Sequence, residues 1–513
     1  MPVSSARTIY AGKVVTMADQ ILDAGLVFVA GERIDALGLA GDAPRAGWES
    51  VPVVETGGVI YPGLVDLHGH LAYNILPPWK VPRQFENRVC WMGSKQYARD
   101  IKLPMKALLA RGGAALARAL VRYVEVKLIL GGTTVAQGLR AMGGPGSGVY
   151  RGLVRNVEVP DQLGLPGAGT RVPDLRDDQI ESMRTSLNTG APYFFHLAEG
   201  FDVRARQQFD LLEQQNLLRD NLVCIHCLGL DDADHQRMRA AGVATVWSPL
   251  SNLLLYGRTL DEGALAGPFA LGCDWSPSGS RNLLHELKVA SLHARHSGWK
   301  IDALQLARSV TADAAVASQW GGQLGVLAAG MLADLLVLDE RNPDPFENLV
   351  HATERDVRLV LIDGLARHGD TQLMSQLVAA GALEQINVGG RDKALHLNDP
   401  DSPLNQLSLA DALEQLRASM SDLTSPLPLQ ARVEAAGDDG FAVELDMELD
   451  PELEQDLALH ALPESLPAEL PLSSIPLDPL TVVDDPGYFD QLDAQHNLPS
   501  HLKGNFGLRA FYR

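Results

Sequence analysis

The sequence predicts an α/β protein in which parallel strands and helices alternate to form a barrel, accompanied by a separate antiparallel sheet. Three observations support this fold class. Short apolar runs alternate with amphipathic stretches through the middle of the chain, strand-like runs flank that region, and histidine or acidic residues follow several of the apolar runs. At 513 residues the chain is too long for one ordinary core, so two or three domains are expected.

The first predicted element is a small antiparallel sheet. Residues 8–17 and 25–34 are β-rich runs that contain glycine turns and lack helical periodicity. A similar signal returns in residues 333–339 and 357–364. We therefore expect one sheet domain that is built from both ends of the body of the chain.

The central region predicts a parallel barrel. Its strand candidates are residues 64–70, 133–138, 152–159, 193–196, 223–226, 243–247 and 269–274. Its helix candidates are residues 114–130, 203–218, 281–296 and 302–318. A closed α/β barrel has eight strands, one more than these candidates supply. Residues 160–175 are rich in Gly and Pro, so the remaining strand is either irregular or lost.

The chain after about residue 385 is rich in Pro, Asp, Glu and Leu. From Arg391 onward there are 23 acidic and seven basic residues, which accounts for −16 of the formal charge of −21. Residues 409–420 fit one amphipathic helix, and residues 441–447 alternate like an edge strand. High charge with few aromatics is also typical of disorder, so a folded cap and a partly disordered extension both remain open. The predicted domains are residues 1–57 and 323–384 for the sheet, 58–322 for the barrel, and 385–513 for an acidic extension of unknown role.

Cysteine usage and the lack of a targeting segment indicate a cytoplasmic protein. The expected partner is a small-molecule substrate, with no nucleic acid and no membrane, and a homo-oligomer remains open. Four cysteines are too few for a disulfide framework. Cys224 and Cys227 have no second pair to complete a zinc site, so we interpret both as small buried apolar residues. The N-terminus lacks a signal-peptide pattern, and no apolar stretch approaches the roughly 20 residues that span a bilayer.

Potential metal ligands follow the predicted barrel strands. They are His68 with His70, His196 with Glu199, His226, and Asp274. His68 and His70 lie two positions apart at the end of an apolar run, so both imidazoles should point the same way. Because the strands are parallel, these clusters can converge at one mouth of the barrel.

Imidazole and carboxylate ligands with one open position are typical of catalytic divalent metal sites. Such an ion lowers the pKa of bound water to about 7, which makes hydrolysis the expected chemistry. His68, His70 and His196 fit the imidazole role, and Asp274 fits the carboxylate role. Glu199 should lie in the loop beyond its strand, where it can reach the water as an acid/base without binding the ion.

In combination these motifs resemble the amidohydrolase superfamily, specifically its mononuclear branch of deaminases and triazine chlorohydrolases. The resemblance covers about residues 5–370. The residues that carry it are Pro62 to His70, Gly131 to Val135, His196 to Glu199, His226, Ser251 with Asn252, Leu271 to Asp274, and Gly330 to Leu338.

The resemblance implies a distorted (β/α)8 TIM barrel with a composite, urease-like β-sandwich domain. It implies one Zn²⁺ or Fe²⁺ ion, with zinc favoured. The implied ligands are His68, His70, His196 and Asp274. Glu199 would move a proton from water to the departing nitrogen, and His226 would hydrogen-bond the substrate or the attacking water. Asp274 would also be the first proton acceptor. The implied activity is hydrolysis of a non-peptide C–N bond, by deamination or by opening of a cyclic amide or amidine.

The lysine content favours a single ion. Many members of the wider superfamily hold two metals through a carboxylated lysine on a middle barrel strand. This chain has no lysine between Lys127 and Lys288, and Lys127 lies in a predicted helix.

The chain departs from the family after the first histidine pair. It continues with Leu71-Ala72-Tyr73 instead of the Met and Leu-Leu-Arg-Gly type residues usual in deaminases of this branch, so the pocket is not that of a recognisable purine or pyrimidine deaminase. Candidate pocket residues, because they lie in loops after barrel strands, are Tyr73, Asn74, Trp79, Asn87 and Arg88. Arg88 could bind an anion, but an exposed arginine is the commoner case and is expected here.

Simpler explanations exist for each residue alone. Glu199 could be a solvated loop acid and Asp274 a helix N-cap, but the ordered combination favours the metal site. Residues 143–148 are glycine-rich without the pattern of a phosphate-binding loop and are interpreted as a flexible loop. Other histidines are interpreted as surface residues, namely His235, His285, His293, His296 and those of the tail.

Two alternatives to C–N hydrolysis remain open. One is hydrolytic dechlorination or another C–X cleavage at the same site, which differs only in the leaving group. The other is a non-catalytic barrel scaffold whose acidic tail docks a partner. The presence of Glu199 and His226 disfavours the scaffold, because a binding role needs no proton shuttle.

Overall fold

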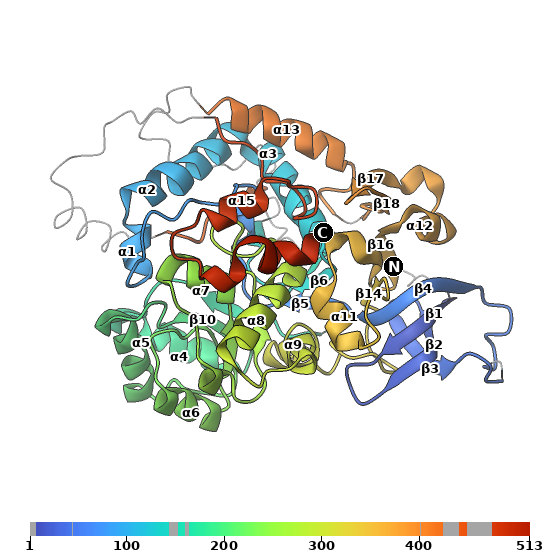
Figure 1. Ribbon diagram of the computed structural model, residues 1–513, viewed down its shortest axis with the longest axis horizontal. Coiled ribbons are helices and arrows are strands. Elements are labelled where there is room, and N and C mark those ends of the chain that lie inside the picture. Colours follow the sequence, from blue (N-terminus) through green and yellow to red (C-terminus); the bar gives the residue numbers. More distant parts are fainter. Residues whose placement is uncertain are drawn as a thin grey trace.

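The computed structural model describes residues 7–43, 45–142, 152–159, 164–400, 402–423, 441–448 and 474–513. Figure 1 shows the N-terminal strands at one side of the molecule and the C-terminal segment, which contains α15, in front of the helices labelled α7 and α8. The glycine-rich loop interpreted at residues 143–148 lies outside the described residues. Within the described ranges no helix has the length and apolarity needed to cross a bilayer.

Parallel strands form a TIM-barrel-type α/β arrangement, as predicted. The strands are β5 (Leu64–Asp66), β6 (Thr133–Ala136), β8 (Arg155–Asn156), β9 (Gly169–Arg171), β10 (Tyr193–Leu197), β11 (Leu222–His226), β12 (Ala244–Trp247) and β13 (Ala270–Leu271). β5, β6 and β8 form one parallel sheet, and β9 to β13 form a second one in sequence order. Each strand is short, and all but the half-buried β9 are largely buried, as expected when helices cover the outside of a parallel sheet.

The strand that the sequence left unlocated is β9. It pairs in parallel with β10, and just before it the backbone N–H of Ala168 donates to the carbonyl of Val157 at 2.7 Å, next to β8. At the other side of the ring, the Asp274 N–H donates to the His68 carbonyl at 2.8 Å and the His70 N–H donates to the Asp274 carbonyl at 2.9 Å. These bonds join the two sheets at both edges and bring the carboxyl ends of all the strands to one mouth.

Helices surround the strands. They are α1 (Arg88–Met92), α2 (Lys95–Tyr97), α3 (Leu103–Leu130), α4 (Ile180–Asn188), α5 (Val203–Gln214), α6 (Asp232–Ala240), α7 (Pro249–Tyr256), α8 (Leu283–Ser297), α9 (Ala303–Ser309) and α10 (Ala312–Ala317). The helices predicted at 114–130, 203–218 and 281–296 are confirmed with shifted ends. α3 is longer than predicted and kinked at Gly113, where φ is 54°. The single helix predicted at 302–318 is wrong: Thr311, with φ −137° and ψ −99°, separates α9 from α10.

A second, largely antiparallel sheet contains strands from both sides of the barrel sequence. Its order is β17-β18-β16-β15-β14-β4-β1-β2-β3. The bounds are β1 (Arg7–Val15), β2 (Ile21–Ala30), β3 (Arg33–Leu39), β4 (Val53–Pro62), β14 (Leu335–Leu338), β15 (Val357–Ile362), β16 (Leu365–Asp370), β17 (Glu384–Val388) and β18 (Arg391–Leu395), with α11 (Pro345–His351) and α12 (Thr371–Leu377) between them. β4 pairs antiparallel with β14 and leads directly into β5. The sheet therefore holds the start of the first barrel strand.

The described parts of the C-terminal extension pack onto the rest of the molecule. α13 (Leu409–Ser421) confirms the predicted amphipathic helix and lies against α3 (Figure 1). The strand predicted at 441–447 is reduced to β19 (Ala442–Val443), which pairs antiparallel with β7 (Ala141–Met142). A further short helix, α15 (Tyr488–Asp493), precedes 3-10 turns that contact α8. For these residues the structure favours a folded cap over a disordered extension.

A buried ion cluster joins the extension to the barrel. The Asp478 carboxylate lies 2.7 Å from Lys127 Nζ on α3 and accepts a hydrogen bond of 2.9 Å from Nε of Arg281, just before α8. Arg281 also pairs with Asp485 at 2.7 Å. Asp478, Lys127 and Arg281 are at most 2% exposed. Each buried charge therefore depends on a partner from another part of the chain. Lys127 is on a helix and paired, so it is not placed to bridge two metals.

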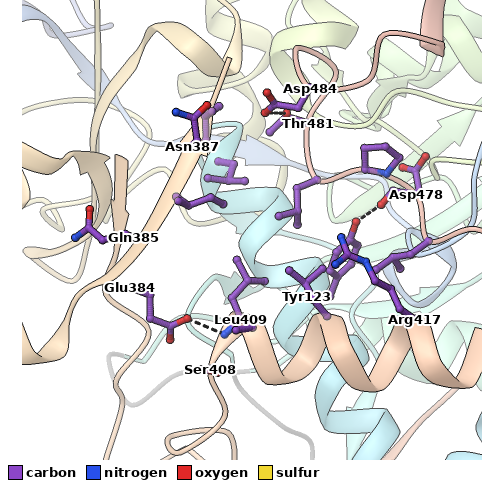
Figure 2. A pocket seen from close by; sticks show the side chains of 18 residues that line it. Tyr123, Glu384, Gln385, Asn387, Ser408, Leu409, Arg417, Asp478, Thr481 and Asp484 are labelled. Carbon is purple, nitrogen blue, oxygen red and sulfur yellow. Dashed lines mark hydrogen bonds between the residues drawn. The ribbon is translucent and has the colours of Figure 1, made fainter. Parts of the chain in front are cut away.

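A groove of about 660 Å³ lies where the extension meets α3 and β17 (Figure 2). Figure 2 shows Tyr123 directed toward the Asp478 backbone and Glu384 directed toward the start of α13, where its Oε2 accepts a hydrogen bond of 2.8 Å from the Leu409 N–H. None of the predicted metal ligands lines this groove. It is therefore separate from the candidate site.

Candidate metal centre

All five predicted ligand and proton-transfer residues that end barrel strands lie at the same mouth. His68 and His70 follow β5, His196 is in β10, His226 ends β11, and Asp274 follows β13. Their exposed fractions are between 0 and 2%. Polar side chains that are buried this deeply need hydrogen-bond or ionic partners, and these five side chains lie next to one another.

Four ligand atoms have the spacing of a tetrahedral metal site. The Nε2 atom of His196 lies 3.1 Å from Nε2 of His68 and 3.2 Å from Nε2 of His70. Oδ1 of Asp274 lies 3.6 Å from both Nε2 atoms of the His68–His70 pair. Ligands at about 2.0–2.1 Å from a tetrahedral ion are separated from one another by about 3.3–3.4 Å. The four distances between these atoms lie close to that spacing, so the residues present suit a divalent metal ion.

The Asp274 carboxylate has one oxygen free for an ion. Its Oδ2 accepts a hydrogen bond from the Ser251 hydroxyl, whereas its Oδ1 is buried without a hydrogen-bond partner among the described residues. An unpaired buried carboxylate oxygen is costly unless a cation compensates it. The fit to a metal ion is thus supported by an unpaired buried oxygen as well as by the distances between the ligand atoms.

Burial keeps two of the histidines neutral. The pKa of His68 and that of His196 lie well below the usual histidine value, because burial and the neighbouring histidines disfavour imidazolium. Neutral imidazole is the form that binds metals. Burial also lowers the pKa of His70, but the carboxylates of Asp446 and Asp274 outweigh that effect and raise it to about 9.

The backbone turns sharply where the strands end. Ala198, His226, Cys227 and Asp274 have φ of 49°, 68°, 54° and 64°, in the left-handed region that side-chain-bearing residues seldom adopt. Such strained positions cluster at functional sites. Here they redirect the chain immediately after β10, β11 and β13, so that the ligand side chains point into the mouth.

Hydrogen bonds hold the ligand rings in one orientation. Nδ1 of His68 lies 2.7 Å from Oγ of Ser248, and Nδ1 of His226 lies 2.8 Å from Oδ1 of Asn252. The Asp66 carboxylate accepts the backbone N–H groups of His68 at 3.2 Å and Cys273 at 3.1 Å, which ties the first barrel strand to the last. Partners on the far ring nitrogen fix the tautomer of a metal-binding histidine.

Comparison with known proteins agrees with this arrangement. The sequence model of the Amidohydrolase family matches residues 196–366. Residues 196–366 belong to the amidohydrolase family. The chain is 31% identical over 217 residues to 5-methylthioadenosine/S-adenosylhomocysteine deaminase of Syntrophobacter fumaroxidans, a match that covers 38% of this chain and 49% of the relative. The chain thus spans about half the length of that relative.

Solved structures share the fold of this chain. An adenosine deaminase from Xanthomonas campestris with bound zinc superposes with a TM-score of 0.55 at 16% identity, over 71% of this chain and 93% of that one. Atrazine chlorohydrolase from Arthrobacter aurescens, complexed with zinc, gives a TM-score of 0.55 at 18% identity, over 70% of this chain and 94% of that one. At these identities the likeness establishes the fold. The neighbours are of the deaminase and chlorohydrolase kinds that the sequence motifs indicate.

Glu199 lies beside the cluster of His68, His70, His196 and Asp274, and hydrogen bonds hold its carboxylate. Its Oε1 accepts a hydrogen bond of 2.6 Å from the Tyr256 hydroxyl, and its Oε2 accepts one of 3.3 Å from Nη1 of Arg88. The same Oε2 lies 3.7 Å from Nε2 of His226. Glu199 is 6% exposed, so it is not a solvated loop acid.

The expectation that Arg88 is exposed is wrong. Arg88 is 3% exposed, and its guanidinium lies between Glu199 and the carboxylate of Asp174, with Nη2 2.5 Å from Asp174 Oδ1. The reason is local: Asn87 caps α1 by accepting the Cys90 N–H at 2.9 Å, which turns the first residue of α1 toward the barrel mouth. The general tendency of arginine to be exposed could not indicate that this arginine is buried.

The other predicted pocket residues are buried near the mouth, and each also has a structural contact. They are Tyr73, Asn74, Trp79 and Asn87. Oδ1 of Asn74 accepts the Ser276 N–H at 2.7 Å, and Nε1 of Trp79 donates to Asp100 at 3.3 Å. Their role in substrate binding stays a prediction.

Two histidines interpreted as surface residues are buried. His235 is 3% exposed and His285 is 0% exposed. His285 lies on α8 beneath the C-terminal segment, where its Nδ1 is 3.4 Å from the Tyr488 hydroxyl. The periodicity of α8 alone could not reveal that a distant segment covers it. Cys224 and Cys227 are free and buried, which confirms their interpretation as apolar residues.

Sequence reasoning missed three residues that support the site. Asp66 lies within the motif Pro62 to His70 without being assigned a role, and Ser248 lies three positions before Ser251; their position at strand ends could have marked them. Asp446 lies in the acidic extension, where nothing in the local sequence separates it from the other carboxylates. Its Oδ2 lies 2.9 Å from Nδ1 of His70.

Proposed function

We propose that this chain is a metal-dependent hydrolase that acts on a non-peptide C–N bond of a small molecule. The observation that carries the proposal is the tetrahedral spacing of four buried ligand atoms beside the oriented carboxylate of Glu199. The relative named as a deaminase and the zinc-containing adenosine deaminase fold support this reaction class.

The proposed centre holds one divalent ion, zinc by preference and iron as the alternative. Its ligands are His68, His70, His196 and Asp274. His226 also comes within 4.8 Å of the ligand atoms of His68 and His196, so it is a geometric competitor. Because Nε2 of His226 lies toward Glu199, we assign it to the substrate side. When bound, the ion lowers the pKa of a coordinated water to about 7.

The protein side chains then handle the protons. Asp274 accepts the first proton, and Glu199 carries a proton to the departing nitrogen. Tyr256 and Arg88 hold Glu199 in place, so its carboxylate needs no reorientation during the reaction. His226, with Nδ1 bonded to Asn252, keeps Nε2 for the substrate or the attacking water.

We assign the parts of the chain to this reaction as follows. A distorted (β/α)8 barrel at residues 58–322 carries the centre, and a composite, urease-like β-sandwich at residues 1–57 and 323–384 supports the first barrel strand. The described parts of the acidic extension, residues 385–400, 402–423, 441–448 and 474–513, pack onto the rest of the chain. Deamination of a heterocyclic amine is favoured over opening of a cyclic amide, because the named relative is a deaminase.

The test is turnover by metal-loaded full-length protein and by Glu199→Gln. Ammonia release is measured across aminopurine nucleosides, aminopyrimidines, lactams and amidines, and chloride release is measured with a chlorotriazine. Glu199→Gln should keep its metal and lose about 10²-fold or more of the rate, the usual contribution of general acid/base catalysis. Glu181→Gln, whose carboxylate pairs with Arg184 on the surface, is the matched control and should be unaffected.

Three results would contradict the proposal. Unchanged turnover by Glu199→Gln would remove its role as proton carrier. Chloride release without ammonia release would replace C–N hydrolysis by dechlorination, and no turnover at all by metal-loaded protein would favour the non-catalytic scaffold.

A further inference from the structure

The C-terminal extension reaches the proposed metal centre through one short segment, residues 441–448. β19 pairs with β7 next to the barrel mouth, and the Glu444 N–H donates to the Arg140 carbonyl at 2.8 Å. Further on, the Met447 carbonyl accepts a hydrogen bond from the Tyr97 hydroxyl, and the Met447 N–H donates to the Tyr73 hydroxyl at 3.3 Å. The residue directly before Met447 therefore lies between two attachments.

That residue, Asp446, is unlike the neighbouring acids of the segment. Its side chain is 7% exposed, whereas those of Glu444 and Glu448 are 50% and 37% exposed. Glu444 pairs with Arg140 at 3.1 Å and Glu448 pairs with Lys106 at 2.8 Å. Asp446 has a histidine as its partner instead.

The partner of Asp446 is the far ring nitrogen of a proposed ligand. Nε2 of His70 faces His196 and Asp274, so only its Nδ1 is left for another contact. Oδ2 of Asp446 lies 2.9 Å from that Nδ1. A carboxylate in this position accepts the Nδ1–H, leaves the Nε2 lone pair for the ion, and makes the ring a stronger ligand.

We propose that Asp446 is a positioning residue for the metal ligand His70, and that residues 441–448 complete the metal centre. The inference rests on the metal site of the proposed function and extends it by giving the acidic extension a role. The equivalent partner of His68 is the hydroxyl of Ser248, which comes from the barrel itself. The carboxylate, the stronger acceptor, comes from a segment 376 positions away in sequence from His70.

The experiment measures metal binding by the full-length chain, with no substrate. Dissociation constants for Zn²⁺ are obtained by competition with a chelator of known affinity, and Co²⁺ is used for its visible absorption spectrum. Asp446→Ala should weaken Zn²⁺ binding by about 10–100-fold, the usual effect of removing such a partner, and should change the Co²⁺ spectrum. Asp446→Asn keeps a hydrogen-bond acceptor without the charge. Its dissociation constant for Zn²⁺ should lie between those of Asp446→Ala and the unmodified chain.

Controls separate positioning from loss of structure. Glu444→Gln removes a carboxylate two positions away and should bind both ions normally. Asp446→Glu restores the charge and should bind Zn²⁺ more tightly than Asp446→Ala. A purely structural effect would lower thermal stability of the metal-free protein but leave the Co²⁺ spectrum of the folded fraction unchanged.

The outcomes distinguish this inference from the proposed function. If the unmodified chain binds Zn²⁺ and Asp446→Ala binds it equally well with the same Co²⁺ spectrum, the positioning role is wrong and the metal site stands. If the unmodified chain binds neither ion, the metal site itself is wrong and both proposals fail.

Discussion

The Tyr256 hydroxyl donates a hydrogen bond of 2.6 Å to Oε1 of Glu199 and accepts one of 2.9 Å from Nε1 of Trp91. This relationship fixes the carboxylate proposed to carry protons, because Tyr256 is fully buried at the end of α7 and has one orientation available. Orientation of Glu199 is thus supplied by residues that do not themselves touch the ligand cluster.

Replacing Tyr256 with Phe should lower kcat by about 10-fold or more, since a hydrogen bond to a charged group contributes about 1.5–3 kcal/mol. The measurement is steady-state kinetics on the best substrate of the panel. Tyr123→Phe is the control, because its hydroxyl contacts the Asp478 backbone by the separate groove. A fall of kcat in the control as large as in Tyr256→Phe would point to general destabilisation instead.

Replacement of His196 should remove the bound metal, whereas replacement of His226 should remove turnover alone. His196→Ala should lose bound metal, because Nε2 of His196 is central to the tetrahedral cluster. His226→Gln should retain metal and lose about 10²-fold or more of the rate. Metal content and turnover are measured on the same samples. Loss of metal from His226→Gln as well as from His196→Ala would show that the three-histidine grouping of His68, His196 and His226 is the ligand set, and retention of metal in His196→Ala would contradict both groupings.

Asp478→Ala should destabilise the protein by about 3–5 kcal/mol, because it leaves Lys127 buried without its anion and leaves Arg281 with Asp485 alone. Urea denaturation measures the effect. Asp490→Asn removes an exposed partner of Arg509 and should cost about 0–1 kcal/mol. Equal stabilities for the two variants would mean that the extension is not anchored by this cluster.

Stability should also depend on pH through Lys288. Burial lowers the pKa of Lys288 from 10.5 to about 7, and its Nζ donates to the carbonyls of Leu284 and Ala352. Between those two pKa values the unfolded chain binds a proton that the folded chain does not, so stability increases with pH in that window. Relative to Lys288→Met, the unmodified protein should gain up to about 1.4 kcal/mol per pH unit from pH 7 toward 10. If the difference in unfolding free energy between the two proteins stayed constant from pH 7 to 10, this prediction would be contradicted.

The ligand cluster could be predicted from the sequence because its members follow strand ends. Parallel strands bring their carboxyl ends to one mouth, so His68 and Asp274 could be placed together although a barrel's length of chain separates them. β9 could not be found, because its three residues are half-buried and lie in a Gly- and Pro-rich stretch. A strand this short has no periodicity to detect.

The contribution of the extension could not be predicted at all. Asp446 is one of 23 acidic residues after Arg391, and only the tertiary path of the chain selects it as the partner of His70. Arg88 was misplaced for a related reason, since its burial depends on the cap at Asn87 and on Asp174 from another loop. Both errors concern contacts that no local pattern encodes.

The central claim is that His68, His70, His196 and Asp274 hold one catalytic ion, and elemental analysis of the purified full-length chain tests it most directly. The account predicts about one equivalent of zinc or iron per chain, and essentially none in the variant that carries both His68→Ala and His70→Ala. An absence of metal from the unmodified protein after growth with added zinc and iron, or the same metal content in the double variant, would contradict it.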